Sequence, residues 1–144
     1  MILSSSQACF DKLMDNACYK ESHVICCFLS MPAEIQTYRF LNQALTAGKT
    51  VFIPKVTGPR PQDMAILELK SYSDISTFPV SKWGIPEPPE TYVSPLNPAL
   101  YSIFDLVIVP GVAFDKNCKR LGHGRGYYGL IYFACYKYFE MTIK

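Results

Sequence analysis

The sequence lacks any Cys-x-x-Cys pair, although it contains six cysteines in 144 residues. Zinc sites and redox motifs usually depend on such spacing. Cys26 and Cys27 lie within an apolar run, which favours small buried thiols in a reducing compartment over a disulfide framework or a zinc site. We therefore expect a cytoplasmic protein. The six positions are Cys9, Cys18, Cys26, Cys27, Cys118 and Cys135.

Strong charge and long apolar runs are missing as well. Charged residues make up 18% of the chain and hydrophobic residues 49%, which argues against disorder, and a net charge of +2 is too small to imply polyanion binding by itself. No basic segment followed by an apolar core marks a secretory signal, and no apolar run approaches membrane-spanning length. We expect one globular domain over residues 1–144, a monomer with no membrane or nucleic-acid partner.

The hydrophobic pattern alternates between helix-like and strand-like segments. Ser6 is expected to cap a first helix with a one-sided apolar stripe, and residues 34–47 predict a second helix that Gly48 ends. Residues 79–98 hold six of the eleven prolines and predict a long ordered loop around Trp83. The expected strands are residues 23–29, 50–54, 64–70 and 103–110.

This order of elements predicts an α/β fold. A strand–helix–strand unit such as residues 23–54 is almost always a right-handed parallel crossover. We therefore expect a mostly parallel sheet with helices on both faces, a Rossmann-like three-layer arrangement. Ligands bind such folds beyond the carboxyl ends of the strands. Four segments should meet there, namely residues 29–31, Pro54, the loop around Trp83 and the glycine-rich segment 120–129.

The segment 120–129 reads Arg-Leu-Gly-His-Gly-Arg-Gly-Tyr-Tyr-Gly. Its first three glycines leave backbone N–H groups open to a ligand, its basic residues add positive charge, and its tyrosines provide flat rings tipped with hydroxyls. A buried strand precedes it and a helix over residues 127–139 is expected to follow, an arrangement that binds phosphate at the helix N-terminus. The spacing matches neither the Walker pattern nor a dinucleotide fingerprint. The alternative is a flexible, solvated loop between two packed elements.

The same topology brings Glu34 and Trp83 toward this crevice. Placed in the first turn of its expected helix, Glu34 can contact a ligand, although an acid at a helix start is also favoured by the helix dipole. Trp83 is either a platform for a ligand or a tryptophan that packs its own loop.

Several blocks of the sequence resemble the 5-formyltetrahydrofolate cyclo-ligases, also called methenyltetrahydrofolate synthetases. The block over residues 109–128 is the specific one, and the earlier matches are weak singly but occur in the right order. Together they cover roughly residues 5–133. The matching stretches are residues 28–31 with Glu34-Ile35, Gly48-Lys49, Ile53-Pro54, residues 83–88, residues 109–115, residues 120–122 and residues 124–128.

The resemblance implies an enzyme that converts 5-formyltetrahydrofolate and ATP into 5,10-methenyltetrahydrofolate, ADP and phosphate, with Mg²⁺. Transfer of the γ-phosphoryl group to the formyl oxygen turns a poor leaving group into a good one, and N10 of the folate then attacks. Such catalysis consists mainly of aligning two ligands and stabilising phosphoryl charge.

The resemblance also implies roles for individual residues. It places Arg125 against the transferring phosphoryl group and Tyr128 near N10 of the folate, as the catalytic pair. It places Leu29 and Glu34 at the pterin and Trp83 in a wall of the folate pocket. The implied nucleotide loop consists of Arg120, Leu121, Gly122, His123, Gly124, Arg125, Gly126, Tyr127 and Tyr128.

Three departures from the family pattern bear on activity. Gly129 stands where the family has an aspartate that resembles a magnesium ligand, and a glycine side chain offers no ligand atom, so we expect no protein metal ligand there. The family also begins with a basic helix that reaches ATP and continues through further strands. We therefore expect a chain truncated at both ends, with C-terminal strands missing and a divergent tail over residues 132–144.

These observations leave three functional classes open. The first is an ATP-dependent cyclo-ligase, and the second is a non-catalytic or impaired isoform that binds nucleotide or folate. The third is single-stranded nucleic-acid binding through Lys116, Lys119, Arg120 and Arg125, with bases stacked on the tyrosines. The basic residues are too few and too local to favour this third class.

Overall fold

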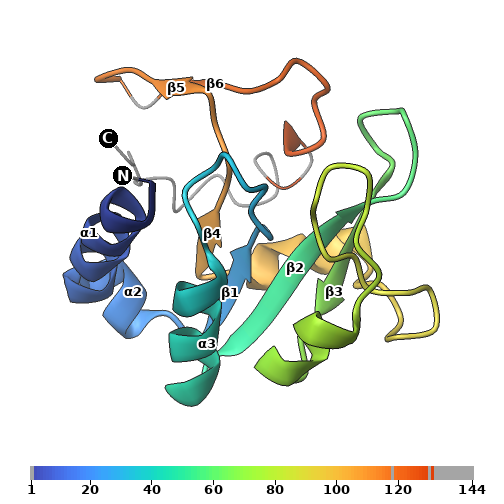
Figure 1. The fold of residues 1–144 in the computed structure, drawn as a ribbon, viewed down its shortest axis with the longest axis horizontal. Helices are drawn as coiled ribbons and strands as arrows, with labels where there is room; N and C mark the ends of the chain where they lie inside the picture. Colours follow the sequence, from blue (N-terminus) through green and yellow to red (C-terminus); the bar gives the residue numbers. More distant parts are fainter. Residues whose placement is uncertain (1, 118, 130, 132–144) are drawn as a thin grey trace.

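The computed structural model describes residues 2–117, 119–129 and 131. A four-stranded sheet with the order β3–β2–β1–β4 lies at its centre (Figure 1). β1 is parallel to both β2 and β4, whereas β3 is antiparallel to β2. The expected α/β class with a mostly parallel sheet is therefore confirmed. The strands are β1 (Val24–Cys27), β2 (Thr50–Val56), β3 (Met64–Glu68) and β4 (Leu106–Ile108).

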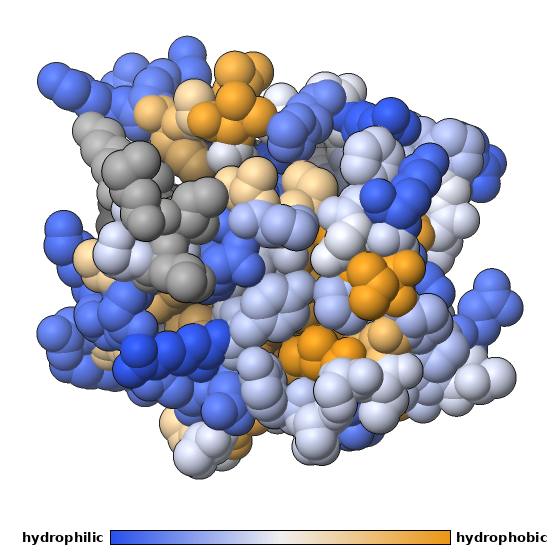
Figure 2. All heavy atoms as spheres, viewed as in Figure 1, coloured by the Kyte–Doolittle hydropathy of each residue, from blue (hydrophilic) through white to orange (hydrophobic). Residues whose placement is uncertain are grey.

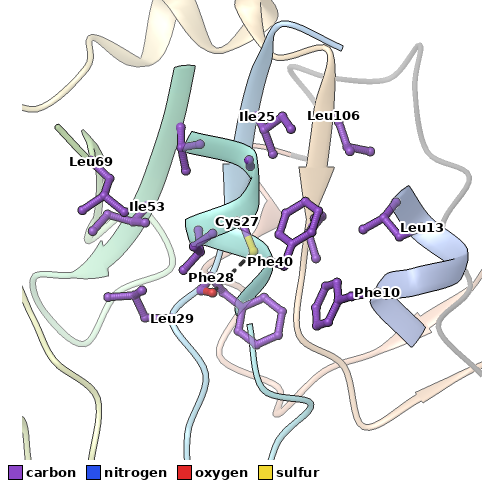
Figure 3. Close-up of a cluster of buried hydrophobic side chains, with 14 of the residues drawn as sticks. Phe10, Leu13, Ile25, Cys27, Phe28, Leu29, Phe40, Ile53, Leu69 and Leu106 are labelled. Carbon is purple, nitrogen blue, oxygen red and sulfur yellow. Dashed lines mark hydrogen bonds between the residues drawn. The ribbon is translucent and has the colours of Figure 1, made fainter. Parts of the chain in front are cut away.

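The main core lies on one face of this sheet, under the α-helices. Phe40 is fully buried, and its ring stacks on Phe10 at a centroid distance of 5.0 Å and packs against Tyr19 at 5.4 Å. Figure 3 shows Phe10 and Phe40 facing Ile25, Leu106 and their neighbours on the strands. The elements over this face are α1 (Ile2–Asp15), α2 (Ala17–Glu21), α3 (Tyr38–Thr46) and the 3₁₀ helix η1 (Tyr72–Thr77).

A second, smaller core lies on the opposite face. Phe52 points to this face, since side chains alternate along a strand and its neighbours Val51 and Ile53 belong to the main core. The 3₁₀ helix η2 (Pro98–Ile103) and the segment after it cover the second face, where Phe104 meets Phe52 edge-on at 5.4 Å. The sheet is thus the middle layer of three.

Two expected helix starts were wrong. Ser6 lies inside α1, where it is buried and its hydroxyl accepts a hydrogen bond from the Gln36 backbone N–H (2.9 Å). The second helix begins at Tyr38 rather than at residue 34, because residues 31–36 form a turn and loop of their own. Gly48 has a φ of +78°, as expected for a residue that ends a helix.

Three further expectations concern the loops and the end of the chain. Residues 79–97 carry no helix or strand beyond one isolated bridge between Val80 and Pro86, so the predicted proline-rich loop is confirmed. Of the helix expected over residues 127–139, Tyr127 and Tyr128 form a turn instead, Gly129 and Ile131 are helical, and residues 130 and 132–139 lie outside the described residues. None of the helices in the described ranges has the length and apolar character needed to cross a bilayer.

The Thr37 hydroxyl holds the loop before α3, and we predict the loss of stability when this hydroxyl is removed. Its side chain is fully buried, and its hydroxyl donates to the Phe28 carbonyl oxygen (2.8 Å). We expect Thr37→Val to lower the free energy of unfolding by about 1–3 kcal/mol, because a buried acceptor loses its partner. Urea unfolding with an unchanged m-value measures this difference.

Thr46→Val is the matched control. The Thr46 hydroxyl also donates to a backbone carbonyl, that of Asn42 (2.8 Å), but on the exposed side of α3. We expect a change within about 0.5 kcal/mol for this variant, as for other surface substitutions. Equal losses in the two variants would show that the Thr37 hydroxyl has no special role in the loop.

Candidate functional site

The chain leaves β4 at the carboxyl end of the sheet and forms a small two-stranded ribbon, β5 (Ala113–Phe114) with β6 (Arg120–Leu121). The Asp115 carboxylate closes the turn by accepting hydrogen bonds from the N–H groups of Asn117 and Lys119, both at 2.8 Å. Leu121 is 61% exposed, and Figure 2 shows apolar surface over this part of the molecule. The ribbon delivers Arg120 to the start of the glycine-rich loop.

Arg120 is held from three sides. Its Nε donates to the Pro110 carbonyl oxygen (2.6 Å), and its Cζ lies 5.3 Å from the ring centroid of Tyr128. A Cβ atom at Gly122 would lie 3.0 Å from both terminal guanidinium nitrogens, so glycine at this position leaves room for the guanidinium. The side chain of Arg120 is therefore placed before any ligand arrives.

Arg120 is a half-buried cation without an acidic partner in the described part of the chain. The ion pairs there join other residues, and the contacts of Arg120 are the Pro110 carbonyl and the Tyr128 ring. Burial lowers the pKa of Arg120, which reflects the cost of keeping the charge there, yet a guanidinium stays protonated at neutral pH. Such a group is suited to an anionic ligand.

The glycine-rich loop after Gly122 is open to solvent. Gly124 and Gly126 have φ values of +82° and +73°, a region that side-chain-bearing residues rarely adopt. His123 and Arg125 are exposed, and neither has a hydrogen bond or ion pair among the described residues. The Arg125 guanidinium and the His123 imidazole thus flank an exposed backbone whose conformation depends on glycine.

Tyr128 joins this loop to the sheet. It is half-buried and packs against both cores. Burial raises the pKa of the Tyr128 phenol well above its usual range, Cys26 and Glu34 add to the rise, and Arg120 opposes it. At neutral pH its hydroxyl is therefore protonated and can donate a hydrogen bond.

The residues expected at the pterin lie in the segment after β1. Leu29 is buried in the main core. Glu34 is half-buried in the following turn, and one of its carboxylate oxygens accepts from the Met31 N–H (2.8 Å). Glu34 is therefore positioned by a loop and not, as its sequence had indicated, by the first turn of a helix.

Trp83 lies beside the same turn. It is 54% exposed, and the Lys82 ammonium lies 5.2 Å from its ring centroid. The next residue, Gly84, has a φ of +75°, and a Cβ atom there would lie 3.2 Å from the ring of Pro32. The proline-rich loop thus packs against the turn that carries Glu34.

The structure therefore gathers the expected segments to different degrees. At the carboxyl end of the sheet, the Arg120 guanidinium lies over the Tyr128 ring, and the Glu34 carboxylate also acts on the pKa of the Tyr128 phenol. Trp83 joins these residues through its loop, while Arg125 and His123 extend into solvent.

Sequence reasoning missed two supporting groups. The first is the Pro110 carbonyl, a backbone atom without any sequence signal. The second is the turn over residues 57–63, which contacts the glycine-rich loop through Gly58 and Pro61. Its Gly-Pro-Arg-Pro sequence between two strands marks a turn, although not its contact.

The described residues do not fit a protein-held metal ion. Across residues 2–117, 119–129 and 131, no three His, Cys, Asp or Glu side chains are grouped so that they could hold one. Gly129 follows Tyr128, and a Cβ atom there would have no neighbour within 4 Å among the described residues. The space for a carboxylate is present at this position, but the carboxylate is not.

Comparison with known proteins now decides the family. The family model described as the 5-formyltetrahydrofolate cyclo-ligase family matches residues 2–143. This chain belongs to that family. The resemblance drawn from the sequence blocks is confirmed.

Curated members of the cyclo-ligase family match most of this chain but are longer. A probable 5-formyltetrahydrofolate cyclo-ligase of Caenorhabditis elegans is 34% identical in an alignment of 142 residues that covers 93% of this chain and 64% of the relative. One of Schizosaccharomyces pombe is 36% identical over 117 residues, 76% of this chain and 52% of the relative. The 5-formyltetrahydrofolate cyclo-ligase of Mus musculus is 32% identical, in an alignment that covers 85% of this chain and 60% of the relative. The chain spans somewhat over half the length of these relatives.

A solved cyclo-ligase-family structure shares the fold. The NMR structure of Aquifex aeolicus 5,10-methenyltetrahydrofolate synthetase superimposes with a TM-score of 0.68 at 26% identity. The match covers 92% of this chain and 62% of that protein. The three-layer arrangement is thus that of the family.

Proposed function

We propose that this chain catalyses the ATP-dependent conversion of 5-formyltetrahydrofolate into 5,10-methenyltetrahydrofolate. The observation that carries the proposal is Arg120, a half-buried guanidinium with no acidic partner in the described chain, beside an open glycine loop in a cyclo-ligase fold. A desolvated cation interacts with a phosphate far more strongly than an exposed one. The site therefore supports binding of a polyphosphate next to a flat second ligand.

The proposed reaction needs no covalent attachment to the protein. The formyl oxygen attacks the γ-phosphorus of ATP, the bond to the β-phosphate oxygen breaks, and ADP leaves. N10 then attacks the activated formyl carbon and loses its proton, and phosphate departs with the formyl oxygen. The protein contributes alignment and charge stabilisation.

In this proposal Arg120 and the N–H groups of the glycine-rich loop bind the phosphates. Arg125 and the neighbouring His123 are exposed and free to reach the transferring phosphoryl group. The Tyr128 hydroxyl, protonated at neutral pH, donates a hydrogen bond on the N10 side of the folate. Leu121 and Tyr127 belong to the same nucleotide loop in this proposal.

The second ligand lies between the turn after β1 and the proline-rich loop. Glu34 accepts paired hydrogen bonds from the aminopyrimidine edge of the pterin, and Trp83 forms an outer wall. Leu29 shapes the floor from within the core.

The remaining proposals concern the setting of the reaction. We propose that ATP carries its Mg²⁺ into the site, since the described residues form no cluster of three His, Cys, Asp or Glu side chains that could hold the ion without the nucleotide. We also propose a cytoplasmic monomer that binds no nucleic acid and no membrane. The free, buried thiol of Cys27 supports a reducing compartment.

The deciding experiment mixes purified chain with 5-formyltetrahydrofolate and MgATP and follows methenyl product by its absorbance. We expect product formation that requires ATP. No product, together with an ATP-induced rise in melting temperature, would instead support a nucleotide- or folate-binding protein without turnover, which the glycine at position 129 favours. Neither product nor thermal protection would contradict both.

A further inference from the structure

The turn between β2 and β3 is a rigid unit. The Thr57 N–H donates to the Asp63 carbonyl oxygen (2.8 Å), and the Asp63 N–H donates to that of Arg60 (2.9 Å). The Arg60 guanidinium meets the Asp63 carboxylate through both Nε and Nη2, at 2.8 to 3.1 Å. A turn fixed by this many internal bonds can support a neighbouring loop.

The neighbouring loop is the glycine-rich one. The Tyr127 hydroxyl donates to the Gly58 carbonyl oxygen (2.8 Å), 69 positions earlier in the chain. A Cβ atom at Gly126 would lie 3.4 Å from the Pro61 ring, so the Gly126 backbone lies against the Pro61 side chain. In Figure 1 the turn after β2 and the end of the glycine-rich segment lie at the same end of the sheet.

The same hairpin also contacts the proline-rich loop. Lys55, near the end of β2, is half-buried, and its ammonium donates to the Pro88 carbonyl oxygen (2.8 Å). Pro88 is itself buried and belongs to the loop that carries Trp83. One hairpin therefore touches both loops at which the two ligands are placed.

We propose that the β2–β3 hairpin is the alignment element of the site, holding the glycine-rich loop through Tyr127 and the Trp83 loop through Lys55. Both are positioning residues, because each acts through a backbone carbonyl of the structure and not on a reacting atom. A shared rigid support keeps the two ligand loops in register, which a reaction governed by alignment requires. The alignment of ATP with folate rests on the proposed function, whereas the support of the two loops does not.

Tyr127→Phe tests the first contact, because it removes one hydroxyl and leaves the ring. In the protein without ligands, we expect amide hydrogen exchange of residues 120–126 to rise about two- to tenfold, the effect of one lost hydrogen bond. We expect the KM for ATP to rise by a similar factor. Tyr92→Phe is the control, because its hydroxyl donates to Asp74 (2.6 Å) elsewhere, and it should leave exchange of residues 120–126 unchanged.

Lys55→Met tests the second contact while preserving an apolar stem. We expect faster exchange over residues 80–90 with residues 120–126 unchanged. Joint loosening of both loops in either single variant would indicate general destabilisation, and unchanged exchange in both would show that the hairpin supports neither loop. Each result would overturn the proposal. The exchange measurements decide the support role even if the wild-type chain fails to turn over ATP, so the two failures are distinguishable.

Discussion

Arg120→Ala is expected to lower kcat for methenyl formation by about 10²- to 10³-fold, the range found when a preorganised charge-stabilising donor is removed. The guanidinium is fixed before binding by the Pro110 carbonyl and the Tyr128 ring, so its charge needs no reorganisation as phosphoryl transfer proceeds. Its partial burial strengthens the interaction with a developing negative charge. Initial rates of product absorbance at saturating ATP and folate measure the effect.

Two variants make this result specific. Arg120→Lys retains a charge but cannot donate through Nε to Pro110 while presenting a planar fork, so we expect partial recovery of the lost rate. Arg39→Ala removes an equally charged side chain that is exposed on α3 and contacts Gln7, and it should leave the rate near that of wild type. If Arg39→Ala and Arg120→Ala lower the rate equally, the role assigned to Arg120 is wrong.

The strands β1, β2 and β4 were predictable because buried parallel strands need nearly continuous apolar runs. β1, β3 and β4 fall within the predicted ranges, and β2 starts at the predicted residue. β2 extends two residues further, to Val56, because β3 pairs with it as far as Met64 opposite Val56. That extension depends on the partner strand β3, so the residues of β2 alone do not predict it.

The start of α3 was not predictable for a related reason. Ile35 lies at helical spacing from the apolar residues of α3, but the two residues after it bond elsewhere: the Gln36 N–H to Ser6 in α1, and the Thr37 hydroxyl to Phe28. These partners lie 30 and nine positions away. Tertiary bonds therefore override the local propensity that placed Glu34 in a helix.

The candidate site divides in the same way. The glycines and cations of residues 120–129 could be found from the sequence, because their residue types carry the property that matters: bare backbone and charge. Their supports are main-chain carbonyls, at Pro110 for Arg120 and at Gly58 for Tyr127. Every residue has a carbonyl, so no residue type marks these two. Sequence thus indicates which groups meet a ligand, whereas only the fold shows what holds them.

Gly129→Asp is expected to raise the rate of methenyl formation and to lower the Mg²⁺ concentration needed for half-maximal rate, each by at least about tenfold. The estimate is the lower end of what losing a supporting partner of a metal ligand costs. Among the described residues the position accepts a side chain, because a Cβ atom there has no neighbour within 4 Å in that part of the chain and its φ is not positive. The added carboxylate would stand directly after Tyr128, next to the phosphates of the proposed ATP site. Titration of Mg²⁺ at fixed ATP measures both quantities.

Gly129→Asn is the control that separates charge from shape. Asn has nearly the same size as Asp and removes the same backbone freedom of glycine, so both variants share any gain in helix stability at this position. Only Asp adds a negative charge, which a hard cation such as Mg²⁺ prefers to a neutral amide. If the two variants have the same rate and the same Mg²⁺ dependence, the missing carboxylate at position 129 does not weaken Mg²⁺ binding. A rate raised in Gly129→Asp but not in Gly129→Asn would show that the missing carboxylate limits the activity of this loop.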